Sequence, residues 1–204
     1  LLPIILISSY IFAQAPAGYY NGTAGLTGYA LKSKLHDIIS DKMINWHYDD
    51  LKALYNQTDL DKYYDHDASN TQYMLDIYSE IPSGSDAYEY KSDQLIAGAS
   101  GEGVGYNREH MMPQSTFSTS SSISDYPMYS DLNFIIPVDA YINQRRNNYP
   151  YGIGNNTNHY IFTNGSRMSN AAIPNYPYTG DREEFMNLLM NLKAILQGLC
   201  YILQ

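Results

Sequence analysis

The sequence has little positive charge, one cysteine and no long apolar run beyond its first residues. Of its 204 residues, 12 are Lys or Arg and 21 are Asp or Glu, which gives a net charge of −9. Such a protein does not attract nucleic acid by its overall field, so contact with a polyanion requires a local basic cluster or a metal ion. The single cysteine, Cys200, excludes a disulfide framework. The zinc-protease pattern HExxH is absent, which argues against a metalloprotease.

The beginning of the chain has the order of a secretory signal. Residues 1–12 are mostly apolar, and Ala13-Gln14-Ala15 follows as a small-residue cleavage site. The run is too short to span a bilayer. We therefore expect residues 1–15 to be a signal peptide cut short at its start, after whose cleavage no membrane attachment remains. A buried N-terminal strand is the alternative.

Apolar spacing predicts one α+β domain, and the length suits a single core. Leu31, Leu35 and Ile38 repeat at helical spacing as far as Met43, with Thr23 or Thr27 as a helix cap. The 22 tyrosines, against five phenylalanines, indicate an amphipathic, wettable surface. Further predictions are a helix at 49–55, a strand at 73–79, loops at 118–124 and 155–158, and a strand at 160–162.

The middle of the chain concentrates the residues of a hydrolytic site. Arg108, Glu109 and His110 stand side by side, and a second polar run, 143–150, carries two more arginines. Carboxylate and amide oxygens suit a hard divalent cation such as Mg²⁺. A neutral histidine can take a proton from water, and arginine suits phosphate. Together these residues predict metal-assisted hydrolysis of a phosphodiester, although a Glu-His pair alone is often structural.

Five ordered motifs point to a family. They are YYNGTAGLTG at 19–28, DIYSE at 76–80, NREH at 107–110, PMYSDL at 127–132 and NQRRNNYPYG at 143–152. On these motifs the chain resembles, from residue 18 to about residue 182, the secreted bacterial endonuclease I family of ββα-metal (His-Me finger) nucleases. The resemblance implies an α+β domain at 18–184 with the ββα-metal motif embedded in it, mostly helices and loops around a small antiparallel sheet.

The resemblance also implies an activity. We expect a metal-dependent endonuclease that hydrolyses DNA without sequence specificity and leaves 5′-phosphate ends, with RNA left open as a second substrate. One ion is expected, Mg²⁺ or else Mn²⁺ or Ca²⁺. The protein is expected to be monomeric and to be secreted or periplasmic.

Roles for single residues follow from the same resemblance. Glu109 corresponds to the metal-holding carboxylate and His110 to the general base. A second ligand is expected from a helix of the family that is matched here by 131–137. Family members often carry Asn or His at the position of Phe134. The nearest candidate in this chain is Asn133, one residue earlier, whose alternative role is to cap a helix. Arg108 and Arg146 are further expected to take part in catalysis. Asn143, Arg145 and Arg146 are expected to bind the substrate. The alternative for the adjacent Arg145 and Arg146 is that they are only a solvated basic pair on the surface.

The end of the chain departs from the family, whose members close with a helix that opens on Glu-Pro-Ile. Here residues 185–204 are rich in Leu and Met. Reverse translation of 186–204 with suitable synonymous codons, read from the third base of the Met186 codon, gives EPINEFKGDIARAMLYFA. This is close to the family's closing helix, so we infer a one-base frame error near Glu183 and a frame-shifted tail at 185–204. The altered tail and Phe134 leave a second hypothesis open, a catalytically impaired secreted binding or surface protein on the same scaffold.

Overall fold

A computed structural model describes residues 15–61, 72–81, 84–117, 122–152, 154–171 and 184–187. They fall into two compact units, one that ends at Ile44 and one that begins at Asn45. Residues 1–14 of the expected signal peptide and 188–204 of the expected frame-shifted tail lie outside the described residues. The boundaries expected for those segments and for the nuclease domain stay predictions.

The first unit contains a series of turns and one helix, α1 (Gly28–Lys42). The predicted helix through Met43 is therefore confirmed, and Met43 is its C-cap. Thr27 occupies the N-cap position with an extended backbone, but its side chain makes no capping hydrogen bond. Before the helix, main-chain bonds such as that from Tyr19 N–H to Pro16 O close successive turns.

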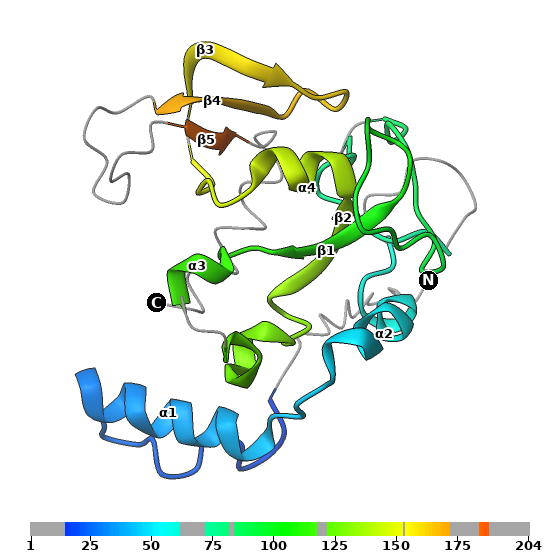
Figure 1. Ribbon diagram of the computed structural model, residues 1–204. Helices are drawn as coiled ribbons and strands as arrows, with labels where there is room; N and C mark the ends of the chain where they lie inside the picture. Colours follow the sequence, from blue (N-terminus) through cyan, green and yellow to red (C-terminus); the bar gives the residue numbers. More distant parts are fainter. Residues whose placement is uncertain are drawn as a thin grey trace, which may run out of the picture. The chain divides into compact units, whose positions relative to one another are not determined.

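The second unit is α+β, with small antiparallel sheets, as predicted (Figure 1). One sheet has two strands in the order β1-β2, and the other has three in the order β3-β4-β5. The elements are η1 (Tyr48–Asp50), α2 (Leu51–Thr58), β1 (Tyr106–His110), α3 (Gln114–Phe117), η2 (Ile123–Asp125), η3 (Pro127–Tyr129), β2 (Ile135–Asp139), α4 (Ala140–Arg146), β3 (Gly154–Ile161), β4 (Arg167–Ala171) and β5 (Glu184–Asn187). None of the described helices is long and apolar enough to cross a membrane.

The two-stranded sheet and the helix after it form the framework of the site. β1 and β2 are antiparallel, with Tyr106 opposite Asp139 and His110 opposite Ile135. α4 follows β2 directly and packs on both strands (Figure 1). Its Ile142 shares a buried cluster with Met168 of β4 and Met186 of β5, so α4 also packs against the second sheet.

Asp139 determines where α4 begins. Its carboxylate caps the helix by accepting a hydrogen bond from Ile142 N–H at 2.8 Å, and it also accepts one from the Tyr90 hydroxyl at 2.6 Å. The N–H of Asp139 donates in turn to Asp76 Oδ2 at 2.9 Å. A capped helix start at this position turns residues 143 and 146, which are one turn apart, to the same side of α4.

Three local predictions were wrong. The segment predicted as a strand at 73–79 has only isolated bridges at Met74, to Leu60 and to Tyr90, because the carbonyl of Asp76 accepts the N–H groups of Ser79 and Glu80 and closes a turn. The segment 155–158, predicted as a loop, belongs to β3, which pairs with β4 in an irregular register. The segment 131–137, matched to a helix of the family, forms a turn and then β2.

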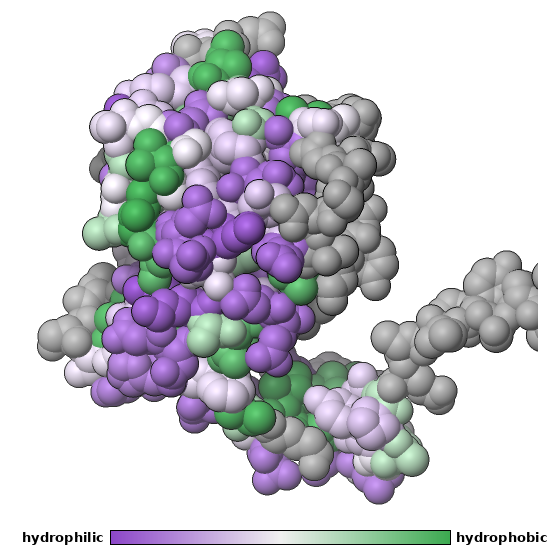
Figure 2. Space-filling model, turned by 90° about the vertical axis from the view of Figure 1, so that its right-hand side faces the viewer, coloured by the Kyte–Doolittle hydropathy of each residue, from purple (hydrophilic) through white to green (hydrophobic). Residues whose placement is uncertain are grey.

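Tyrosines contribute to the core as well as to the surface. Tyr55, Tyr78, Tyr90 and Tyr106 are at most 1 % exposed, and each hydroxyl has a hydrogen-bond partner. A buried phenol is stable only when its hydroxyl is bonded, so these rings fill the interior without an unpaired polar group. The face drawn in Figure 2 is largely hydrophilic, with apolar residues in separated groups.

Candidate active site

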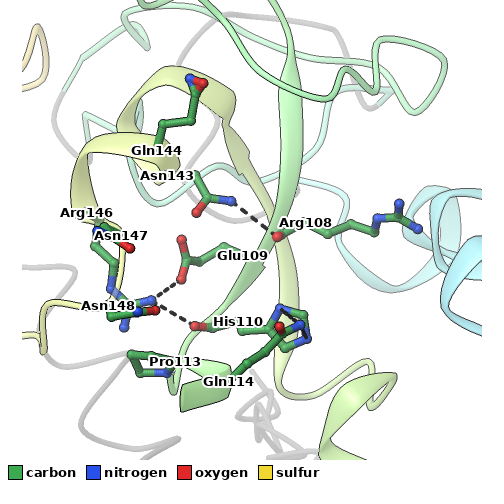
Figure 3. Close-up of a pocket in the computed structure, with 10 residues that line it drawn as sticks. All are labelled: Arg108, Glu109, His110, Pro113, Gln114, Asn143, Gln144, Arg146, Asn147 and Asn148. Carbon is green, nitrogen blue, oxygen red and sulfur yellow. Dashed lines mark hydrogen bonds and ion pairs between the residues drawn. The ribbon is translucent and has the colours of Figure 1, made fainter. Parts of the chain in front are cut away.

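A cavity of about 290 Å³ lies between the end of β1 and the side of α4. It is lined by Arg108, Glu109, His110, Pro113, Gln114, Asn143, Gln144, Arg146, Asn147 and Asn148 (Figure 3). The cavity therefore brings together the two polar runs that the sequence separates by more than thirty residues.

Glu109 is buried at the centre of this cavity, 1 % exposed. Its Oε1 accepts a charged hydrogen bond from Arg146, whereas its buried Oε2 has no hydrogen-bond partner among the described residues. Burial raises the pKa of Glu109 to about 7, against the opposing effects of Arg146 and the Tyr78 hydroxyl. One carboxylate oxygen is thus held in place by the protein while the other is left without a donor, an arrangement that a cation would satisfy.

Arg146 holds Glu109 in position. Its guanidinium donates to Glu109, to His110 O at 2.9 Å and to Met111 O at 2.7 Å, and it stacks over the ring of Tyr151. Burial alone lowers the pKa of Arg146, but Glu109 raises it above its usual value, so the side chain stays cationic. With NH1 and NH2 bonded to protein acceptors, Arg146 joins α4 to the end of β1; its expected contact with phosphate stays a prediction.

Asn143 lies one turn before Arg146 on α4 and faces the same cavity. Its Nδ2 donates to Arg108 O at 3.2 Å, which fixes the orientation of the amide. Figure 3 shows the amide oxygen of Asn143 and the carboxylate of Glu109 turned toward the same space. These two side chains are the oxygen donors that could hold a hard cation here.

The ring of His110 lies on the opposite side of β1 from Glu109, because successive strand residues alternate (Figure 3). It stacks on Tyr48 at 5.8 Å and bonds the Gln114 amide at 3.1 Å. Burial, together with Arg146 and Arg108 and against the opposing effect of the Tyr129 carbonyl, lowers the pKa of His110 to about 4. The imidazole is therefore neutral at neutral pH, the form that accepts a proton.

Arg108 extends away from Glu109 (Figure 3). Its guanidinium lies 3.8 Å from the ring centre of Tyr48 and donates to Tyr48 O at 2.7 Å and to Asp49 Oδ1 at 3.3 Å. These contacts hold η1 against β1. These contacts give Arg108 a structural role in packing. Its expected catalytic role stays a prediction.

Asn133 does not line the cavity. It is exposed in the turn before β2, where its Nδ2 donates to Asp131 Oδ1 at 3.2 Å. It does not begin a helix either, so the capping role considered for it is wrong. Phe134, where the resemblance led us to expect a ligand, is 1 % exposed and packs edge-on against Phe117.

Arg145 lines a neighbouring cavity of about 430 Å³ that shares Gln144 and Asn147 with the first. It is exposed, lies over the rings of Tyr141 and Tyr160, and donates to the Tyr160 hydroxyl at 2.9 Å. The two adjacent arginines thus have different surroundings, one buried and the other exposed.

Sequence reasoning missed Gln114, Asn147 and Asn148 as cavity residues and gave Asn143 a role toward the substrate alone. A signal was present for Asn143. It stands three residues before Arg146, and residues at that spacing share one side of a helix. Nothing in the sequence pointed to Gln114.

The comparisons with known proteins agree with the sequence motifs. The family model described as Endonuclease I matches residues 27–184, which is most of the chain and includes both polar runs of the cavity. No curated protein and no solved structure matches this chain.

Proposed function

We propose that the cavity between β1 and α4 is a metal-dependent phosphodiesterase site, because the chain belongs to the endonuclease I family. Membership of that family makes the protein a nuclease. We read β1, β2 and α4 as the ββα-metal (His-Me finger) motif of that family. The observation that carries the proposal is Glu109, a fully buried carboxylate whose Oε2 has no hydrogen-bond partner among the described residues and which faces the amide of Asn143.

The residues present fit a hard divalent cation. Glu109 supplies a carboxylate oxygen, and Asn143, whose Nδ2 is bonded to Arg108 O, supplies an amide oxygen. We propose Asn143 as the second ligand in place of Asn133, which is exposed outside the cavity. Held by Glu109 and Asn143, Mg²⁺, or Mn²⁺ or Ca²⁺, would supply a positive charge that offsets the negative charge of the phosphate and its leaving group.

The remaining roles belong to the chain itself. His110, neutral at neutral pH, accepts the proton of the water that attacks phosphorus. The Tyr129 carbonyl, which accepts a hydrogen bond from Nε2–H, orients its ring beside Gln114. Arg146 holds Glu109, and Arg145, exposed beside the second cavity, contacts the phosphate backbone. Contacts to phosphate carry no base information, so cleavage of DNA, with RNA as a further substrate to test, is not sequence-specific.

Three further properties are proposed from the family resemblance and the first residues of the sequence. The product ends are 5′-phosphates, the protein acts as a monomer, and it is secreted or periplasmic. The rival hypothesis of an impaired binding protein was based partly on Phe134. It is weakened here, because Asn143 offers an amide oxygen inside the cavity.

Cleavage of supercoiled plasmid DNA tests the proposal. The purified chain should nick and linearise plasmid in Mg²⁺, lose this activity in a chelator, and regain it when Mg²⁺ is added in excess. Structured RNA in the same buffer measures the second substrate. A chain that binds DNA but cleaves none in Mg²⁺, Mn²⁺ or Ca²⁺ supports the impaired scaffold instead.

A further inference from the structure

Three acidic side chains meet away from the cavity of Glu109. Asp61 follows α2, Glu80 follows the turn closed by Asp76, and Asp86 lies in the next loop. Each offers a carboxylate oxygen, and the three oxygens lie within 4.8 Å of one another. Asp61 is 5 % exposed and Glu80 is 0 % exposed, so the cluster is largely closed to water.

Glu80 is the unusual member of this cluster. Both of its Oε atoms are buried, and neither has a hydrogen-bond partner among the described residues. Burial, followed by the nearby Asp86 and Asp61, raises the pKa of Glu80 to about 9. A buried carboxyl beside two others is stable only if a proton is shared within the group or a cation is bound to it.

We propose that Asp61, Glu80 and Asp86 bind a structural divalent cation of the calcium class, at a second site independent of the nuclease centre. Ca²⁺ takes oxygen ligands at about 2.3–2.6 Å, so oxygens on opposite sides of the ion lie up to about 5 Å apart. The separation within the cluster fits this range. Irregular loop carboxylates suit the flexible coordination of Ca²⁺ better than the strict octahedron of Mg²⁺.

The ion joins segments that main-chain bonds already bring together, since Asp61 N–H donates to Tyr73 O at 3.0 Å and Ala87 N–H donates to Ser79 O at 3.3 Å. Asp86 Oδ1 accepts from Ile81 N–H at 2.9 Å, and Glu80 O accepts from Asn164, between β3 and β4, at 3.3 Å. The N–H of Glu80 donates to Asp76 O, and Asp76 Oδ2 accepts from Asp139 N–H, the residue that caps α4. Calcium at this site therefore stabilises the segment that fixes the start of α4.

Calorimetric titration of the full chain with Ca²⁺, after treatment with a chelator and its removal, tests the proposal. The variant is Glu80→Gln, which keeps the shape of the side chain and removes its charge. Asp93→Asn, at an exposed turn, is the matched control. Glu109→Gln separates the two sites. We expect Asp93→Asn and Glu109→Gln to keep the Ca²⁺ binding that Glu80→Gln weakens by about tenfold or more, because affinity at oxygen sites follows the number of charged ligands.

Thermal melting supplies the second measurement. At a Ca²⁺ concentration of about 100 times Kd, the parent should melt about 5–10 °C higher than in chelator. Because the nuclease cavity could itself take Ca²⁺, this comparison is made in a Glu109→Gln background. There the Glu80→Gln change should abolish the rise, yet in chelator it should cost no stability, because the repulsion among three carboxylates is reduced. If Glu80→Gln does not fold, Asp86→Asn, at a half-buried position, replaces it.

The result that overturns the proposal is a parent whose melting temperature does not respond to Ca²⁺, or a Glu80→Gln variant with unchanged Ca²⁺ affinity. Either outcome means that the cluster shares a proton. In the Glu109→Gln background, where the nuclease cavity lacks its carboxylate, an equal or larger rise with Mg²⁺ overturns the assignment to calcium. Loss of plasmid cleavage in Glu109→Gln with the Ca²⁺ response intact leaves the second site standing, so failure of one proposal is distinguishable from failure of the other.

Discussion

Arg146 of α4 and Glu109 of β1 form a buried ion pair, with side chains 2 % and 1 % exposed. The same guanidinium bonds the carbonyl oxygens of His110 and Met111, so one side chain fixes three consecutive residues at the end of β1. The pair therefore links the position of the carboxylate to the packing of the helix. Because both charges are removed from water, loss of either partner leaves the other charge buried and unpaired, so the site requires both residues.

Replacing Arg146 by Met should destabilise the protein strongly. The change leaves the carboxylate of Glu109 buried and unpaired, a loss of about 3–5 kcal/mol in the free energy of unfolding. Arg145→Met is the matched control, since that arginine is exposed and its loss should cost no more than about 1 kcal/mol. Urea denaturation of both variants gives the comparison. Equal losses at the two positions would show that the buried pair contributes no more than a surface contact.

Asn143→Ala should raise the Mg²⁺ concentration needed for half-maximal plasmid cleavage, because it removes an amide oxygen from the cavity. Asn133→Ala should leave that concentration unchanged, since Asn133 is exposed outside the cavity. Metal titration of cleavage on both variants decides between the two ligands. A shift in Asn133→Ala alone would return the ligand to the position first expected from the sequence.

The sequence was sufficient to predict the family, the α+β class and the two polar runs that meet in the cavity. It failed where a structure depends on partners far along the chain. The alternation around Asp76 resembles a strand, but its carboxylate also accepts from Asp139, 63 residues later, and the segment turns. Alternation along β1 predicts in principle that Glu109 and His110 point to opposite sides, yet their adjacency suggested a joint position.

The choice of Asn133 illustrates the same limit. Matching 131–137 to a helix placed its amide near the metal, whereas the apolar residues after it pair with β1 as β2. The helix that faces Glu109 starts only after Asp139. Tyrosine was judged from composition alone, which cannot distinguish a surface phenol from one whose hydroxyl bonds a distant carbonyl, as Tyr55 does with Ile135.

Restoring the reading frame near Glu183 should give a more stable and more active protein. The alternative frame supplies Glu, Lys, Asp and Arg along an amphipathic helix in place of a Leu-rich tail that tends to associate. Soluble yield, melting temperature and plasmid cleavage of the two versions provide the test. In the written frame, Met186 is buried in β5 and its N–H donates to Pro150 O. If the written version performs equally well, this strand is a genuine end to the sheet and the frame-error inference fails.

The most direct test of the central claim is the plasmid cleavage rate of His110→Ala beside that of His159→Ala, both in saturating Mg²⁺. His159 is exposed on β3, whereas His110 is among the residues that line the cavity, with its ring on the side of β1 away from Glu109 (Figure 3). We expect His110→Ala to lose about 10²–10⁴-fold of the rate, the usual contribution of a positioned general base. His159→Ala should cleave at a near-parental rate, and circular dichroism should show that both variants are folded. A folded His110→Ala protein that cleaves DNA at the parental rate would contradict the assignment of this cavity as the nuclease site.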